Sequence, residues 1–153
     1  MKTGQATRKP LILDTNIVLD LFVFNDPEII ALKTSLLAGL ESKQLDWIAT
    51  ADMRIELERV LTYPKITPRM AFYQVTAADV LAKFDQLATL VDPAPKAKWV
   101  CKDPDDQRFI DLAVQHQATL LSKDQAVLCM AKRMLTAGAL VQKATDFTPQ
   151  IST

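Results

Sequence analysis

The sequence has little of several residue types that mark specialised classes of protein. Its 153 residues include only 2 cysteines, 3 glycines and 1 histidine. Cys101 and Cys129 lack a CxxC spacing, so we expect small core residues in a reducing compartment, not a disulfide framework or a zinc site. The longest apolar stretch, residues 11–24, is interrupted by polar residues and is shorter than the ~20 residues of a membrane-spanning helix. No signal peptide is recognisable, so we expect a cytoplasmic protein without a membrane partner.

Net charge is also missing. The chain has 18 basic and 18 acidic residues, which give a formal net charge of zero. This balance excludes a uniformly basic chain that coats nucleic acid or membranes by charge alone, so a polyanion would have to bind at a local patch. The length and the 49% hydrophobic content fit one globular domain with a single core.

Short apolar runs alternate with helical patterns along the chain. Strands are predicted over residues 11–13, 45–49, 99–101, 118–121 and 139–141. Helices are predicted over residues 16–25, 27–43 (with Asp26 as N-cap), 51–61 (with Thr50 as N-cap), 69–90 (as one long or two short helices), 103–117 and 124–136. This alternation predicts an α/β domain with a mainly parallel sheet.

Acidic residues follow three of the predicted strands. Asp14 follows the first strand, Asp103, Asp105 and Asp106 follow the third, and Asp124 follows the fourth. The carboxyl ends of parallel strands meet at one edge of a sheet, where ligands bind, so we expect these side chains to converge. Two carboxylates ~4 Å apart repel by roughly 4 kcal/mol at an effective dielectric of about 20, so a cation must offset them. Clusters of oxygen ligands suit Mg²⁺ or Mn²⁺, and the residues therefore permit metal-assisted hydrolysis.

Four segments of the chain together resemble the PIN domain family. They are Leu13-Asp14-Thr15-Asn16, the helix Ile55–Leu61 followed by Tyr63-Pro64-Lys65, the run Lys102–Asp106, and Leu121-Ser122-Lys123-Asp124. The resemblance covers about residues 11–140. More narrowly, the segments look like the bacterial and archaeal branch described as toxin components of toxin–antitoxin systems. It implies a PIN-like three-layer α/β/α sandwich with a mainly parallel central sheet. The implied division is a flexible segment 1–9, a single domain 10–147 and a C-terminal tail 148–153.

The resemblance further implies a metal-dependent endoribonuclease that uses Mg²⁺ or Mn²⁺. The implied catalytic and metal-binding acids are Asp14, Glu56, Asp106 and Asp124, with Asp103 and Asp105 as alternatives. Asp106 is preferred because it lies 18 positions before Asp124, the offset expected in the family. The implied partners are single-stranded or looped RNA, a cognate antitoxin and a second copy of the chain.

Other residues are candidates for supporting roles. Thr15, Asn16 and Ser122 are expected to hydrogen-bond ligands or phosphate, and Lys102, Arg108 and Lys123 to contact RNA phosphate. Lys123 departs from the family, which commonly has a small residue there, so it either contacts phosphate or weakens metal binding. A basic stretch of Lys96, Lys98 and Lys102 precedes the acidic run and is either a solvated loop or a further phosphate contact.

Simpler interpretations stay open beside these. Asp14, the run 103–106 and Asp124 could each cap a helix, and Glu56 could be a solvated residue with weak surface pairing. A receiver-like signalling domain needs adjacent acids near the first strand, and a haloacid-type phosphatase needs an Asp where Asn16 stands. Both are disfavoured, whereas a catalytically silent PIN-like module that binds RNA or protein remains the alternative function.

Overall fold

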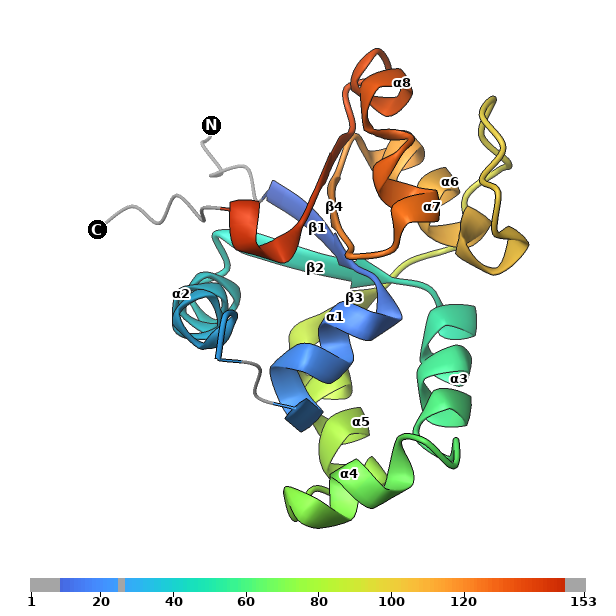
Figure 1. The fold of residues 1–153 in the computed structure, drawn as a ribbon. Coiled ribbons are helices and arrows are strands. Elements are labelled where there is room, and N and C mark those ends of the chain that lie inside the picture. The colour runs from blue at the N-terminus through green and yellow to red at the C-terminus, as the bar shows by residue number, and fades with distance from the viewer. Residues whose placement is uncertain (1–8, 25–26, 148–153) are drawn as a thin grey trace.

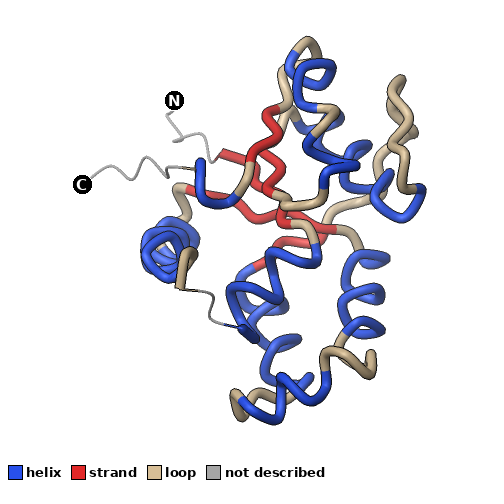
Figure 2. The backbone as a smooth tube through the Cα atoms, viewed as in Figure 1, coloured by secondary structure: helices blue, strands red, loops and turns tan. Residues whose placement is uncertain are grey.

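The computed structural model describes residues 9–24 and 27–147, and its centre is a five-stranded parallel sheet (Figure 1). The strand order is β3-β2-β1-β4-β5, and every neighbouring pair is parallel. The strands are β1 (Lys9–Leu13), β2 (Leu45–Ala49), β3 (Ala88–Leu90), β4 (Thr119–Leu121) and β5 (Leu140–Gln142). Figure 2 shows the strands in red at the centre with helices around them.

Helices cover both sides of this sheet. They are α1 (Thr15–Leu19), the π-helix η1 (Asp20–Phe24), α2 (Ile30–Glu41), α3 (Ala51–Val60), α4 (Thr67–Phe72), α5 (Ala77–Leu87), the 3₁₀ turn η2 (Pro104–Asp106), α6 (Gln107–His116), α7 (Gln125–Leu128), α8 (Ala131–Leu135) and the 3₁₀ turn η3 (Ala144–Asp146). In Figure 1, α1, α3, α4 and α5 lie on one side of the sheet, and α6, α7 and α8 lie on the other. The predicted three-layer α/β/α architecture is therefore confirmed. Within the described part of the chain, no helix combines the length and the apolar character needed to cross a membrane.

The core forms where the two helical layers meet the sheet. Leu11, Ile12 and Leu13 of β1 are at most 4% exposed, as expected for a parallel strand covered on both faces. Trp47 of β2 is 1% exposed, stacks on Phe22 at 6.4 Å and meets Phe84 edge-on at 5.2 Å, measured between ring centroids. These contacts join the helices around η1 and α5 to the middle of the sheet.

The third strand does not lie where the sequence predicted it. β3 is Ala88–Leu90 and pairs with β2 through Thr89, whereas the predicted strand over residues 99–101 lies in a loop. The main chain of this loop is paired with a side chain: Gln107 bonds the carbonyl of Trp99 and the N–H of Cys101. Those backbone groups cannot then form a ladder with a neighbouring strand.

The predicted last long helix is two short ones. The chain turns at residues 129–130 between α7 and α8, and Val127, Met130 and Met134 all face the core, with at most 1% of each exposed. The turn leaves Cys129 exposed, whereas Cys101 is buried as expected.

Several predicted boundaries shift. The first helix begins at Thr15 and is π-helical from Asp20, and α2 begins at Ile30, not at residue 27. The predicted cap Asp26 and the tail 148–153 lie outside the described residues. β1 begins at Lys9, the last residue of the segment predicted to be flexible, because Lys9 already pairs with Leu45.

The strand order places a topological switch point beside β1. The chain builds β2 and β3 on one side of β1 and then returns to add β4 and β5 on the other. Such a reversal opens a crevice at the carboxyl ends of the two strands that flank it, here β1 and β4. Asp14 follows β1, and Ser122 to Asp124 follow β4, so both segments reach this crevice.

Candidate metal centre

A polar hollow of about 250 Å³ lies at the carboxyl ends of β1 and β4. The residues around it come from the ends of β1 and β4, from α3, and from η2 and the start of α6. Its acidic side chains are Asp14, Glu56, Asp103, Asp105, Asp106 and Asp124. The fold thus brings all four acids implied by the resemblance, and both alternatives, to one place.

Asp14 follows the carboxyl end of β1, and Ser122 holds its side chain there. Its side chain makes no capping hydrogen bond to α1, and the residue is only 3% exposed. The hydroxyl of Ser122 donates to Asp14 Oδ2 at 2.7 Å and accepts from the N–H of Asp124 at 3.0 Å. Ser122 is fully buried, so it joins the ends of β1 and β4 across 108 positions of sequence. Asp14 thus stands at the N-cap position of α1, but among the described residues its side chain makes no capping hydrogen bond.

Three carboxylates form the tightest group in the hollow. Asp103, Asp106 and Asp124 each offer an oxygen, and these oxygens lie within 4.8 Å of one another. Asp106 is 7% exposed, and its Oδ2 is buried with no hydrogen-bond donor from the described residues. A buried carboxylate oxygen without a partner is costly, and a bound cation would satisfy it. Asp103 was only an alternative in the sequence prediction, yet the geometry places it in this group.

The carboxyl groups of this cluster are disturbed by burial and by one another. Burial raises the pKa of Asp14, and the hydrogen bond from Ser122 only partly opposes the rise. Burial, followed by the contact with the Asp124 carboxyl and the charge of Asp14, raises the pKa of Asp106 to about 8. Without a metal, the carboxyl of Asp106 therefore keeps its proton near neutral pH. A bound divalent cation could replace that proton.

Glu56 approaches the hollow from α3. It accepts a hydrogen bond from Thr15 Oγ1 at 3.0 Å, and Arg108 Nη1 lies 3.5 Å from its other oxygen. The Glu56 side chain is 17% exposed. It is thus fixed by residues from two other elements and is not a freely solvated helix residue.

Two of the acids also cap short helices. Asp124 accepts from the N–H of Ala126, and Asp103 accepts from the N–H of Asp105, each at 3.0 Å. In both residues Oδ1 receives this bond. Asp103 and Asp124 therefore cap helices and belong to the acidic cluster at the same time, and the capping bond fixes the orientation of each carboxylate.

The sequence profile of the family described as PIN domain matches residues 10–126. The chain belongs to the PIN domain family. No curated protein matches the sequence. PIN domains are generally metal-dependent nucleases, so the family and the acidic cluster agree on a nuclease fold with a candidate site for a divalent metal.

The candidate phosphate contacts lie in different surroundings in this PIN domain. Lys102 is exposed just before the acidic cluster, and Arg108 lines the hollow. Lys123 lies against Asp20 of η1 instead, with Nζ 3.0 Å from both carboxylate oxygens, and lines a neighbouring cavity of about 250 Å³. Asn16 is exposed and lines the hollow itself.

Three lining residues were missed from the sequence. Arg59, Val60 and Tyr63 border the hollow of this PIN domain beside Glu56. They stand three, four and seven positions after Glu56, which is the spacing of residues on one helical face. Helical periodicity applied to Glu56 could have found them.

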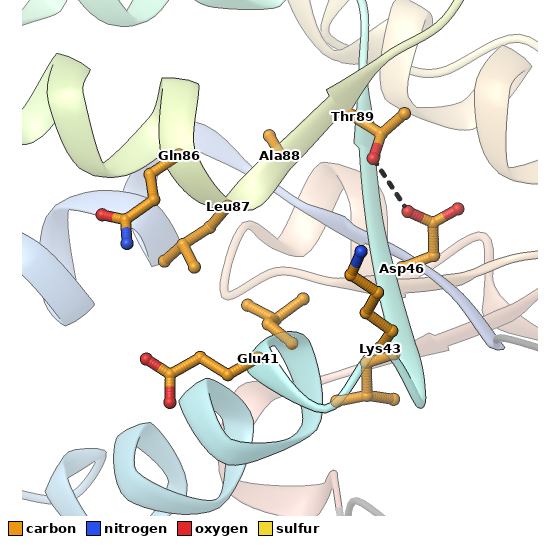
Figure 3. Close-up of a pocket in the computed structure, with 9 residues that line it drawn as sticks. Glu41, Lys43, Asp46, Gln86, Leu87, Ala88 and Thr89 are labelled. Atoms are coloured by element: carbon orange, nitrogen blue, oxygen red, sulfur yellow. Dashed lines mark hydrogen bonds between the residues drawn. The ribbon is translucent and has the colours of Figure 1, made fainter.

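A second hollow of this PIN domain lies at the opposite edge of the sheet, between the end of α2 and the junction of α5 with β3 (Figure 3). Its volume is about 380 Å³. Figure 3 shows Lys43 and Asp46 on one side and Glu41 and Gln86 on the other, and Asp46 accepts a hydrogen bond from Thr89 at 3.0 Å. Opposite charges alternate around this hollow, so it lacks the concentration of carboxylates found at the end of β1.

Proposed function

We propose that this PIN domain is an endoribonuclease that depends on Mg²⁺ or Mn²⁺. The observation that carries the proposal is the buried Asp106 oxygen without a donor, on a carboxylate that lies within 4.8 Å, oxygen to oxygen, of those of Asp103 and Asp124. Oxygen ligands alone suit a hard divalent cation, and the chain has too few His and Cys residues for a zinc centre. The choice of RNA as substrate is supported by the resemblance of the four segments to the toxin branch of the family.

Asp14 and Asp106 are the proposed direct ligands, because both are buried and fixed at the ends of rigid elements. Asp103, Asp124 and Glu56 would bind directly or through water, since Mg²⁺ usually retains several waters. The bound ion would lower the pKa of a water molecule and stabilise charge on the phosphate oxygens.

Residues beside the acids have positioning roles in this proposal. Ser122 fixes Asp14 and the main chain of Asp124, and Thr15 fixes Glu56. Arg108 stands at the same hollow with its guanidinium beside Glu56, where it can attract a phosphate group. Carboxylates would hold the ion, while the guanidinium would orient the anionic substrate.

Replacement of single carboxylates tests the nuclease proposal. Asp14→Asn and Asp106→Asn should each abolish metal-dependent cleavage of an RNA pool while the circular dichroism spectrum stays that of the wild type. Glu58→Gln is the matched control, because Glu58 is exposed on α3 and does not line the hollow. Full cleavage by either Asn variant would overturn the assignment. Binding of RNA by the wild type without cleavage in either metal would instead support a catalytically silent module.

We extend the proposal to a toxin role, which is supported only by the resemblance to the toxin branch. Expression of the wild type should then arrest bacterial growth, and expression of Asp14→Asn at the same level should not. The proposed protein partners are a cognate antitoxin and a second copy of this chain, with which it would form a homodimer. Equal growth with both forms of the protein would contradict the toxin role.

A further inference from the structure

We propose that residues 93–102, the lysine loop, bind single-stranded RNA beside the acidic hollow. The loop is part of the connection 91–103 between β3 and η2, and it projects next to α6 as the yellow trace in Figure 1. The proposal rests on the proposed function for the identity of the polyanion, and it assigns a substrate form and a binding surface to that function.

The loop presents positive charge on its outer side. Between positions 93 and 102 there are three lysines, Lys96, Lys98 and Lys102, and no acidic residue. All three lysines are exposed, as is Val100, whereas residues 97, 99 and 101 are partly or fully buried. The ammonium groups therefore face solvent, while residues 97, 99 and 101 attach the loop to the domain.

Hydrogen bonds from α6 hold the loop in place. Gln107 accepts from the N–H of Cys101 at 2.7 Å and donates both to the carbonyl of Trp99 and to Asp111, each at 2.9 Å. Asp111 in turn accepts from the N–H of Ala97 at 2.8 Å. Cys101 is buried, with its sulfur 3.3 Å from the carbonyl of Ala126. A loop that is already ordered loses less conformational entropy when a ligand binds.

The anchor of the loop is adjacent to the acidic cluster. Gln107 directly follows Asp106, and Lys102 directly precedes Asp103, so the loop and the carboxylates share the start of α6. The carboxylates by themselves repel a phosphate chain. A row of cations next to them would attract that chain and bring one of its phosphodiesters to the hollow.

Trp99 is the aromatic residue of the loop on which an unpaired base would stack. Its ring is partly buried against the core, and Lys98 Nζ lies 5.7 Å from the ring centroid. Unpaired bases stack on aromatic side chains beside cations in single-strand binding sites. Bases in a duplex are already stacked on one another and leave only phosphates within reach of the loop.

Tryptophan fluorescence can test this surface without any cleavage. The chain has 2 tryptophans, and Trp47 is 1% exposed, so quenching by a nucleic acid reports on Trp99. An unstructured RNA oligonucleotide in EDTA should quench the emission, and the same sequence in a duplex should not. Trp99→Ala should weaken binding of the single strand about tenfold, as expected for loss of one stacked base.

Charge removal supplies the second measurement. The triple variant Lys96→Ala, Lys98→Ala, Lys102→Ala should bind the single strand at least tenfold more weakly. It should also lower the slope of log affinity against log salt by about 2, because each lost phosphate contact removes roughly 0.7. The matched control is Lys83→Ala, Lys132→Ala, Arg133→Ala, which removes the same charge from exposed positions on α5 and α8.

The outcomes separate the loop from the nuclease. Equal weakening in both triple variants, or equal quenching by duplex and single strand, would overturn the lysine loop as a single-strand site. Normal cleavage by a loop triple variant that also binds like the wild type would overturn the loop and leave the nuclease intact. Quenching by a protein that cleaves nothing would support the loop and refute the nuclease.

Discussion

The Asp106→Asn substitution should stabilise the metal-free protein at pH 8. Asp106 has a pKa of about 8 in the folded chain, compared with 3.8 as its ordinary value. The folded state therefore keeps a proton that the unfolded state releases between these two values. Bound protons favour the folded state as the pH falls, so the contribution of Asp106 to folding becomes less favourable as the pH rises from about 4 to about 8. Asparagine carries no charge and removes this dependence.

The size of the effect follows from the pKa difference. Each unit corresponds to about 1.36 kcal/mol, so a difference of about 4 units sets an upper bound of roughly 5–6 kcal/mol. Water in the hollow screens part of the repulsion, which leaves an expected gain of about 1–3 kcal/mol at pH 8. Near pH 4 the gain should be small, because the carboxyl is protonated in the folded state and about two-fifths protonated in the unfolded state.

Urea unfolding in EDTA measures this difference directly. The free energy of unfolding of wild type and variant is compared at pH 4, 6 and 8, with tryptophan emission and circular dichroism as probes of unfolding. Asp105→Asn is the control, because Asp105 borders the same hollow but is exposed. A variant that is less stable than the wild type at pH 8, or a difference that does not change with pH, would refute the reasoning from burial and repulsion.

Three further predictions follow from the same region. Mg²⁺ or Mn²⁺ at ten times its dissociation constant should raise the unfolding free energy of the wild type by about 1.4 kcal/mol, and thermal unfolding should show no such gain for Asp106→Asn. Ser122→Ala should lower the free energy of unfolding by about 1–3 kcal/mol and slow RNA cleavage, because Asp14 loses its buried hydrogen-bond donor. Unchanged urea unfolding would contradict the role of Ser122 in holding Asp14. Lys123→Met should lower the free energy of unfolding by about 1–2 kcal/mol, because Asp20 stays buried without its cation. The variant should still cleave RNA; complete loss of cleavage in a folded variant would place Lys123 in the site.

The sequence was sufficient to predict those elements that are determined by burial and by the parallel direction of the strands. The run 45–49 is a strand over the whole predicted range, and Thr50 caps the next helix by accepting from the N–H of Met53 at 3.3 Å. Asp14 was predicted at the end of a buried strand and lies there. Parallel strands present their carboxyl ends together, so convergence of the acids followed from the order of strands and helices.

The sequence was insufficient where spatial neighbours decide. Residues 99–101 have the composition of a strand, but the side chain of Gln107 takes the hydrogen bonds that a strand would need. Asp103 ranked behind Asp106 by sequence offset, and only the turn at η2 brings both to Asp124. The ion pair of Lys123 with Asp20 could not be predicted either, because Asp20 lies 103 positions away; the phosphate contact of Lys123 stays a prediction.

The position of β4 beside β1 sets an order of events during synthesis. Asp14 and Glu56 leave the ribosome early, but their hollow is incomplete until Asp106, Ser122 and Asp124 have been made and β4 has paired with β1. Contacts between such distant parts of a chain form late in folding. A nascent chain of this domain therefore cannot assemble the complete acidic centre, and any activity of that centre begins only once nearly the whole domain has been synthesised.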